Sequence, residues 1–143
     1  ELALAPDAAC TGDAELLGRL MRNLLDNAVK YAPAGTVVRV GLARDAHAYR
    51  VTVADQGPGI PPDARPHVFE RFFRAEKARS RAERTTTSGA GLGLAIARWV
   101  AEAHDGRLEL VRSGEDGSVF AAILPTGPLE GSGPPVDHAG GGN

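Results

Sequence analysis

Apolar residues recur at helical spacing between Ala14 and about Ala32. They return every three or four positions, which places them on one face of a helix with 3.6 residues per turn. These residues are Leu16, Leu17, Leu20, Met21, Leu24, Leu25, Ala28 and Val29. Asp13 has the side chain of a helix N-cap, and Pro33 and Gly35 end the pattern. The pattern predicts one long amphipathic helix.

Strand patterns follow this helix and return near the end of the chain. Residues 36–43 are rich in valine, and apolar residues alternate with polar ones over 49–53. We therefore expect two strands joined in a hairpin around 45–47. Two more strands are expected over 107–112 and 118–124.

A second helix is expected from Gly91 to His104. A short helical segment is expected before it, over about 63–69. We expect the second helix to pack through a single apolar stripe. That stripe consists of Leu92, Ile96, Trp99 and Ala103.

Two segments lack an apolar period. Residues from about 74 to 90 are charged and rich in Thr and Ser, and a loop of this length predicts a mobile lid. Residues 126–143 are dominated by Gly and Pro with almost nothing apolar to bury, so we expect a disordered tail. We therefore expect one folded domain over 1–125, a size that can bury a core without disulfides or a structural metal.

Composition narrows the functional classes. Hydrophobic residues make up 43% and charged residues 24% of the 143 residues, and the net charge is -2, as in an ordinary soluble domain. No broad basic field points to nucleic acid. The single cysteine, Cys10, cannot form an internal disulfide, and no Cys/His group has metal-ligand spacing. No apolar stretch approaches the roughly 20 residues that span a bilayer.

Polar residues interrupt the apolar face of the first helix. Asn23, Asn27, Lys30 and Tyr31 stand at i, i+4, i+7 and i+8, which is one stripe of a helix. A buried amide without a partner costs about 1–3 kcal/mol. The two asparagines therefore need either internal partners or a ligand, and the spacing leaves both open.

Asp55 stands at the end of the second predicted strand. It has the parity of Val51 and Val53, so its carboxylate is expected on the face turned toward the helices. One interpretation is an aspartate that starts a turn. The other is a hydrogen-bond acceptor for an exocyclic amine, since Gly57 and Gly59 would let a planar ligand approach the backbone.

A glycine-rich segment, Ser88–Leu94, opens the second predicted helix. Backbone N–H groups at such a helix start, together with the positive end of the helix dipole, bind phosphate oxygens. The segment does not resemble a dinucleotide fingerprint, because a loop precedes it, and it lacks the Lys-Ser/Thr of a P-loop. A different nucleotide-binding fold is required.

These motifs, read in order, resemble the N, first glycine, F and second glycine boxes of sensor histidine kinase catalytic domains, in the GHKL or Bergerat-fold ATPase superfamily. They occupy Asn23–Tyr31, Asp55–Ile60, Phe69–Arg74 and Gly89–Leu94, followed by Glu102–Gly106. Each motif alone is weak, but four in order rarely coincide by chance. The resemblance covers about residues 11–125.

The resemblance implies the Bergerat fold. This is an α/β (α+β) two-layer sandwich, in which a mixed, mostly antiparallel sheet of about five strands is covered on one face by about three helices. The order of elements expected from the periodicities agrees with it. ATP and Mg²⁺ would lie between the helices and the lid.

The resemblance also implies a role for each motif residue. Asn27 would ligate Mg²⁺, Asn23 and Lys30 would meet the phosphates, and Asn27 and Lys30 would be the catalytic pair. Tyr31 would border the base, and Asp55 would accept the adenine amino hydrogen. The remaining nucleotide contacts would come from Gly57, Gly59, Ile60, Arg74, Gly89, Gly91, Leu92, Gly93 and Leu94.

Basic and aromatic residues flank these contacts. The basic residues of the lid would neutralise phosphate charge and order the loop on binding, or stay solvated. They are Arg74, Lys77, Arg79, Arg81 and Arg84. The F-box aromatics, Phe69, Phe72 and Phe73, are expected to anchor the lid by packing and not to touch nucleotide.

Two positions depart from the family pattern. Ala90 stands where the family often has a small hydroxyl residue, so a side-chain phosphate contact is missing there. Asp105 replaces a common glycine. We expect no catalytic effect of this second change.

The phosphoacceptor is expected on another domain. None of the four histidines combines a mid-helix position with a following acidic residue: His47, His67, His104 and His138. The resemblance implies an acceptor helix hairpin upstream, in a parent kinase that is usually dimeric and anchored in the cell membrane, with this domain in the cytoplasm. The chain would transfer the γ-phosphate of ATP to that hairpin, and a response regulator would be the further partner.

Two other functions stay open. An ATPase of the gyrase, MutL or heat-shock chaperone kind carries a glutamate four residues before its metal-binding asparagine to activate water, and here that position is Asn23. A nucleotide-sensing or partner-binding module would keep the pocket and transfer nothing. The F box and the long lid favour the kinase without excluding that module.

Overall fold

The computed structural model of the chain describes residues 1–4, 10–74 and 91–126. The predicted lid, apart from Arg74, and the predicted tail, apart from Thr126, lie outside these residues. The boundaries of the folded domain therefore stay a prediction.

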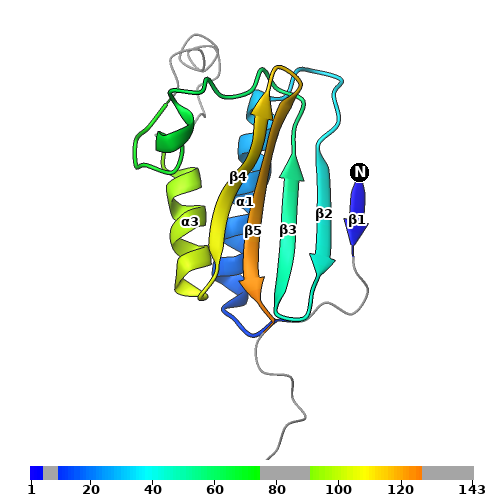
Figure 1. Ribbon diagram of the computed structural model, residues 1–143, viewed down its shortest axis with the longest axis vertical. Helices are drawn as coiled ribbons and strands as arrows, with labels where there is room; N and C mark the ends of the chain where they lie inside the picture. The colour runs from blue at the N-terminus through cyan, green and yellow to red at the C-terminus, as the bar shows by residue number, and fades with distance from the viewer. Residues whose placement is uncertain (5–9, 75–90, 127–143) are drawn as a thin grey trace, which may run out of the picture.

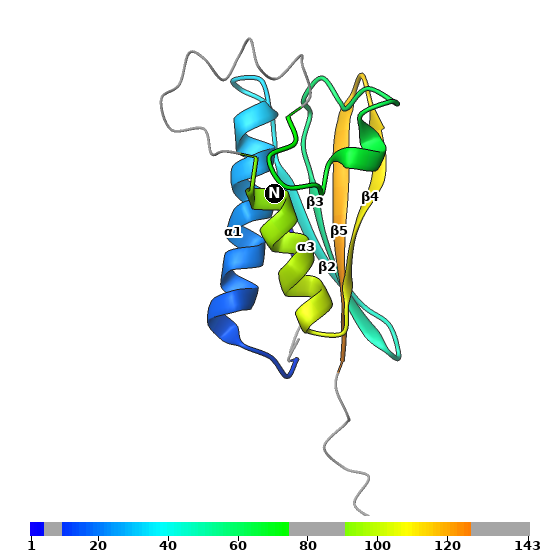
Figure 2. The ribbon, with the colours of Figure 1, turned by 90° about the vertical axis from the view of Figure 1, so that its left-hand side faces the viewer.

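The described residues form two layers, a sheet and a layer of helices on one of its faces (Figures 1 and 2). The strands pair in the order β1-β2-β3-β5-β4, with β1 parallel to β2 and all other neighbours antiparallel. The predicted sandwich with a mixed, mostly antiparallel sheet is confirmed. The strands are β1 Leu2–Leu4, β2 Arg39–Arg44, β3 Ala48–Ala54, β4 Arg107–Gly114 and β5 Gly117–Pro125.

The helical layer consists of α1, Ala14–Tyr31, and α3, Gly93–Ala103, and these two helices pack against each other. The described residues also form one short 3-10 helix, η1, Arg65–His67. The Asp13 side chain caps α1, because its Oδ1 accepts a hydrogen bond from the N–H of Leu16 at 3.0 Å. The first predicted helix and its cap are therefore confirmed. No helix of the described residues is both long and apolar enough to cross a membrane.

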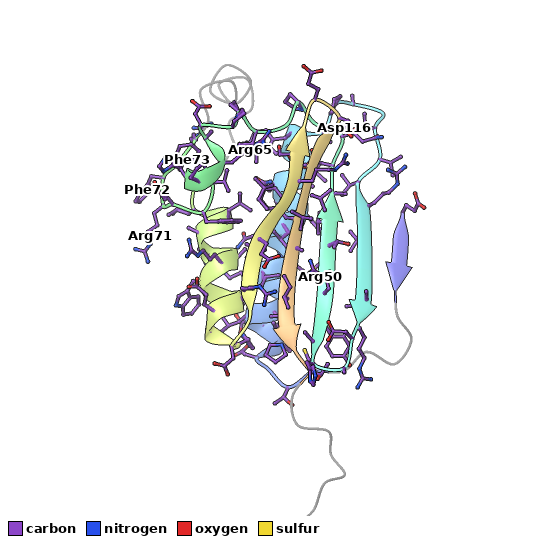
Figure 3. All side chains as sticks on the ribbon, viewed as in Figure 1. Arg50, Arg65, Arg71, Phe72, Phe73 and Asp116 are labelled. Atoms are coloured by element: carbon purple, nitrogen blue, oxygen red, sulfur yellow. The ribbon has the colours of Figure 1, made fainter. Side chains whose placement is uncertain are left out.

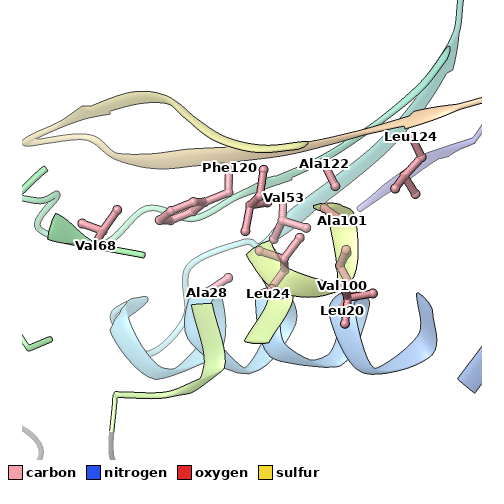
Figure 4. Packing of buried hydrophobic residues seen from close by; sticks show 12 residues of the cluster. Leu20, Leu24, Ala28, Val53, Val68, Val100, Ala101, Phe120, Ala122 and Leu124 are labelled. Carbon is pink, nitrogen blue, oxygen red and sulfur yellow. The ribbon is translucent and has the colours of Figure 1, made fainter. Parts of the chain in front are cut away.

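The hydrophobic core lies between the two layers (Figure 4). Leu20 and Leu24 of α1 and Val100 of α3 face Val53 of β3 and Phe120 of β5. All of these side chains are at most 3% exposed. The burial of these apolar side chains stabilises the packing of the helices on the centre of the sheet.

One strand was missed by the sequence analysis, and two predicted elements need correction. Strand β1 was not predicted, because three residues are too few to show an alternation. The first predicted strand begins at Arg39 and not at residue 36, since 36–38 form no ladder with β3. The short helical segment expected over 63–69 is limited to η1, which has a proline in its first turn.

The buried face of α3 agrees with the predicted stripe at Ile96, which packs on the core, but differs from it further along the helix. Ala97, Val100 and Ala101 are fully buried, whereas Trp99 is 55% exposed and Ala103 is exposed. Small side chains let α3 approach α1 and the sheet closely, and this packing overrides the preference of the larger apolar residues for burial. The large side chain of Trp99 therefore misled the prediction of the buried stripe.

The C-terminus of α3 explains the departure at position 105. The N–H of Gly106 donates to the Ala101 carbonyl at 2.8 Å, and the N–H of Asp105 donates to the Glu102 carbonyl at 3.1 Å. This is the Schellman pattern, which places the residue after the cap in the left-handed region. Asp105 occupies that position with φ of 56°. A glycine is common there because it adopts this conformation without strain.

We expect Asp105→Gly to raise the melting temperature by about 2–4 °C, a gain of roughly 0.5–1 kcal/mol, because the strain of the left-handed residue is relieved. The matched control is Ala103→Gly in the last turn of α3, which should lower stability by about 1 kcal/mol. Thermal denaturation of the three chains measures both shifts. If Asp105→Gly lowers the melting temperature as Ala103→Gly does, the backbone strain proposed at Asp105 is absent.

Candidate functional site

The amide stripe of α1 contains polar atoms without protein partners. Asn23 and Asn27 are both half-buried. The Nδ2 atom of Asn23 is buried and finds no hydrogen-bond partner among the described residues. The sequence left open whether the asparagines have internal partners or a ligand. Among the described residues, no internal partner binds this nitrogen. A buried amide of this kind is stabilised when a ligand or ordered water supplies the acceptor.

The N-terminus of α3 lies next to this stripe. A Cβ atom built on Gly93 would lie 3.7 Å from Oδ1 of Asn23. The first hydrogen bond of α3 runs from the N–H of Ile96 to the Leu92 carbonyl, and Leu92 provides no side-chain cap. The amides of residues 93–95 thus precede the helical ladder, and the positive end of the helix dipole adds to their attraction for anions. The fold therefore brings Asn23 of the N box next to the uncapped start of α3.

The C-terminal end of α1 meets the first glycine box. A Cβ atom on Gly57 would lie 2.8 Å from the carbonyl oxygen of Tyr31 and 2.9 Å from Oδ1 of Asp55. Any larger residue would push these two segments apart. The Lys30 ammonium lies 5.0 Å from the centre of the Tyr31 ring, so a cation also stands at this end of α1.

Asp55 is a buried carboxylate at the end of β3. It is 8% exposed, and its Oδ1 accepts a hydrogen bond of 2.8 Å from the N–H of Gly57. Burial raises the pKa of Asp55 above 3.8, and hydrogen bonds with the backbone of Gly57 and Ser118 act in the opposite direction. Asp55 therefore lies on the inward face, as its parity predicted.

Gly59 and Ile60 contact the hairpin between β4 and β5. Gly59 has φ of +73°, and a Cβ atom there would lie 2.1 Å from the carbonyl oxygen of Gly114. The N–H of Ile60 donates to Oγ of Ser113 at 2.7 Å. Close approach of other protein segments thus requires a glycine at both positions of this box, and the ligand approach suggested by the sequence stays a prediction.

The F box joins the second glycine box. The N–H of Phe72 donates to the Gly91 carbonyl at 2.9 Å, and Gly91 has φ of +75° with no room for a Cβ atom beside Phe73. Residues 72 and 91, which flank the predicted lid, are therefore held together. Arg74 is half-buried, and its Nε atom has no partner among the described residues.

The three F-box phenylalanines do not behave alike. Phe69 meets the Phe120 ring edge to face with centroids 6.0 Å apart, and Phe73 also packs on the core. Phe72 is 68% exposed and has φ of 63° (Figure 3). Phe69 and Phe73 therefore pack as predicted, whereas the exposed side chain of Phe72 does not pack on the core.

The structure gathers most of the predicted site residues and leaves a few undescribed. Leu92 and Leu94 lie at the start of α3, and Leu94 packs on the core. The remaining predicted residues lie outside the described part of the chain: Lys77, Arg79, Arg81, Arg84, Gly89 and Ala90. Ser113 and Ser118 were missed by the sequence reasoning. No local pattern marked them, because the N–H of Ile60, the partner of Ser113, lies 53 positions earlier in the chain.

His104 has a structural role at the opposite end of α3. Its Nδ1 lies 2.8 Å from the Val100 carbonyl, and its Nε2 accepts a hydrogen bond of 3.0 Å from the N–H of Asp13. With Nε2 as the acceptor, Nδ1 carries the proton and donates it. His104 therefore links the end of α3 to the cap of α1, as expected for a helix-end histidine. His138 lies outside the described residues.

The two-layer sandwich thus carries a buried strand-end carboxylate, a stripe of amides and an uncapped helix start on one side of its sheet. The chain belongs to the family described as histidine kinase-, DNA gyrase B-, and HSP90-like ATPases, whose sequence model matches residues 12–128. Membership of this family implies ATP binding.

Named relatives narrow the class. The chain is 44% identical over 114 residues to the sensor-like histidine kinase SenX3 of Mycobacterium tuberculosis, which covers 80% of the chain and 27% of that protein. It is 47% identical over 122 residues to the signal transduction histidine-protein kinase/phosphatase MprB of Mycolicibacterium vanbaalenii, which covers 82% of the chain and 24% of that protein. The chain thus spans about a quarter of the length of these curated relatives.

Solved structures agree with the sequence comparison. The mycobacterial sensor histidine kinase MprB superposes with a TM-score of 0.73 at 38% identity, covering 87% of this chain and 81% of that one. Full-length ShkA in complex with AMPPNP gives a TM-score of 0.70 at 32% identity, covering 87% of this chain and 25% of that one. The relatives are therefore sensor histidine kinases, and the chain matches their ATPase domain.

Proposed function

We propose that this chain binds Mg-ATP and transfers the γ-phosphate to a histidine on a separate phosphoacceptor domain of the same two-component sensor kinase. The proposal rests on the buried Nδ2 atom of Asn23, which has no hydrogen-bond partner among the described residues. The Asn23 side chain lies next to the uncapped start of α3. Amide hydrogens and helix-start N–H groups both suit phosphate oxygens. The related ShkA, whose full-length structure is a complex with AMPPNP, supports the binding of a nucleotide.

The adenine end of the site is assigned to Asp55. Its carboxylate is fixed by the N–H of Gly57 and keeps acceptor capacity for the adenine amino group. Tyr31 lies beside Gly57 and borders the base. The buried position of Asp55 excludes water from this hydrogen bond, which strengthens the recognition of the base.

The phosphate end is assigned to Asn23, Lys30 and the start of α3. Phosphoryl transfer depends mainly on positioning and on neutralising the charge of the phosphates. Lys30 and the helix dipole supply positive charge, and Asn23 donates hydrogen bonds. The predicted lid contacts, including Arg74 and the second glycine box, complete the charge balance in this proposal.

Asn27 fits the expected Mg²⁺. Its side chain is half-buried, one turn after Asn23, and has no described hydrogen-bond partner, so its amide oxygen is available. Mg²⁺ prefers oxygen ligands and is usually held by one or two protein groups together with phosphates and water. When bound, the ion would neutralise phosphate charge. Asn27 would hold it, and Asn27 and Lys30 would be the catalytic residues of this chain.

The partners follow from the reaction. The acceptor helix hairpin and the response regulator belong to the proposal, as does a parent kinase anchored in the cell membrane with this domain in the cytoplasm. A water-activating ATPase is disfavoured, because an amide such as Asn23 cannot serve as a general base.

One assay distinguishes the three functions. The chain is given radiolabelled ATP with and without a separate acceptor hairpin from the parent kinase. We expect label on the hairpin. Steady release of phosphate without labelling would instead indicate a hydrolase, and tight binding without either reaction would indicate a nucleotide sensor.

A further inference from the structure

Two serine hydroxyls support the first glycine box from the neighbouring hairpin. Oγ of Ser113 accepts a hydrogen bond of 2.7 Å from the N–H of Ile60, and it lies 2.9 Å from Oγ of Ser118. Ser118 is 4% exposed. We name Ser113 and Ser118 the serine pair. Neither residue belongs to the four motifs described above, and neither is included in the proposed nucleotide contacts.

Ser113 on β4, Ser118 on β5 and Asp55 at the end of β3 occupy neighbouring positions across the sheet. Ser113 is opposite Ser118 in the β4–β5 ladder. The N–H of Asp55 donates to the Ser118 carbonyl at 2.9 Å, directly beyond the last registered pair of β3 and β5, Ala54 and Val119. The three oxygen-bearing side chains therefore stand side by side at the end of the sheet where the first glycine box begins.

Ile60 is held from both sides. Its N–H is bound by Ser113, and its carbonyl accepts a hydrogen bond of 3.0 Å from Nε of Arg65. Close backbone contacts fix the neighbouring residues, since a Cβ atom on Gly117 would lie 1.9 Å from the Asp55 carbonyl oxygen. The hairpin tip and residues 57–60 therefore cannot shift independently.

Loss of the Ser113 hydroxyl would break this arrangement at one point. The N–H of Ile60 and the hydroxyl of Ser118 would both lose a partner in a partly buried environment, and such unsatisfied groups drive local rearrangement. The segment free to rearrange is 57–60, because β3 before it and the neighbouring β4–β5 hairpin are held by their ladders. The N–H of Gly57, which orients the Asp55 carboxylate, moves with it.

We propose that Ser113 is a positioning residue for adenine recognition, acting through the Ile60 N–H and the Gly57 N–H on the Asp55 carboxylate. The inference rests on the proposed function, because it deepens the assignment of Asp55 to the adenine. It assigns no contact with nucleotide to Ser113 itself. Its effect is therefore on base affinity and base selectivity, and the phosphate end of the site is unchanged.

The test compares Ser113→Ala with a matched control, Thr52→Ala. Thr52 also carries a half-buried hydroxyl with a hydrogen bond to the backbone, although as a donor, at 3.5 Å from the Gly41 carbonyl oxygen. It stands on β3 at the parity opposite to Val53 and Asp55. Affinities for AMPPNP and for the guanine analogue GMPPNP are measured by calorimetry. We expect Ser113→Ala to bind AMPPNP about tenfold more weakly, to lose a similar factor of selectivity over GMPPNP, and to keep its phosphotransfer kcat within about twofold. Thr52→Ala and Ser113→Thr should bind like the unmodified chain.

The outcomes separate the two proposals. Absence of AMPPNP binding by the unmodified, folded chain would refute the proposed function itself. Normal binding by the unmodified chain and by Ser113→Ala would overturn only the role of Ser113, as would an equal loss of affinity for both nucleotides. If Ser113→Ala does not fold, Ser113→Cys keeps the volume with a weaker acceptor, and unchanged selectivity in that variant would overturn the role equally.

Discussion

Asn27→Ala is expected to reduce phosphotransfer to the acceptor hairpin by about 100-fold or more, because it removes the protein oxygen proposed to hold Mg²⁺ at the phosphates. The fold should tolerate the change. The Asn27 side chain has no described hydrogen-bond partner, and alanine is the better helix former. The variant should therefore melt at the same temperature as the unmodified chain or slightly higher, while its transfer rate collapses.

The control for Asn27→Ala is Val29→Ala. Val29 is on the same helix, is 67% exposed, and lies outside the amide stripe. Transfer of label from ATP is measured together with thermal denaturation for both variants. Full activity of Asn27→Ala at saturating Mg-ATP would show that the metal assignment is wrong. Equal loss of activity in Val29→Ala would show that the effect is not specific to the stripe.

Asp55→Asn is expected to weaken ATP binding by about 100-fold and, at the same time, to stabilise the nucleotide-free fold. The asparagine keeps an oxygen for the N–H of Gly57 and turns an amide nitrogen toward the adenine amino group. Two donors then face each other, so the base loses its hydrogen bond and a repulsion is added. Calorimetry with AMPPNP measures the loss of affinity.

The stabilisation follows from the raised pKa of Asp55. Burial holds its pKa above 3.8 in the folded chain, so the folded chain binds this proton more tightly than the unfolded chain. The stability that this proton contributes is present below pH 3.8 and is lost as the pH rises through the folded pKa. The melting temperature of Asp55→Asn should therefore exceed that of the unmodified chain increasingly as the pH rises from about 4 to 7.

Asp45→Asn is the control with the opposite sign. Asp45 accepts hydrogen bonds of 2.8 Å from the backbone N–H groups of His47 and Ala48, and these bonds lower its pKa below 3.8. The stability that it contributes is present above pH 3.8 and is lost as the pH falls. The Asp45→Asn variant should thus be less stable near neutral pH. An Asp55→Asn difference that does not grow with pH would contradict the raised pKa.

Both Asn27→Ala and Asp55→Asn are expected to lower activity without lowering the stability of the nucleotide-free fold. Asn23, Asn27 and Asp55 are polar groups in half-buried or buried positions, and each is expected to lower the stability of the nucleotide-free chain. Such groups are retained where a ligand satisfies them. The opposite signs expected for stability and activity therefore distinguish functional residues from structural ones in this domain.

Much of the fold followed from local pattern. The spacing of Leu20 and Leu24 determined the buried face of α1, and Asp13 marked its start, because residues one turn apart share a face whatever the rest of the chain does. The alternation in β3 likewise placed Val53 and Asp55 on one face. The order of the four motifs indicated the family, which the comparisons confirmed.

Other features depended on contacts between distant segments. The parallel pairing of β1 with β2 joins residues 38 positions apart, and a strand of three residues has no pattern of its own. The orientation of α3 was decided by its close packing, which buries Ala97 and Ala101 and exposes Trp99.

The sequence by itself determined the class of protein and the residues available for nucleotide binding, because periodicity and motif order are properties of short segments. Only the tertiary structure decided which of those residues meet. It brought Gly93 to Asn23, Gly57 to Tyr31, and the Ser113 hydroxyl to the N–H of Ile60, 53 positions earlier in the chain. Hydrogen bonds and steric limits of this range arise when the core packs the two layers together, so no local pattern could have indicated them.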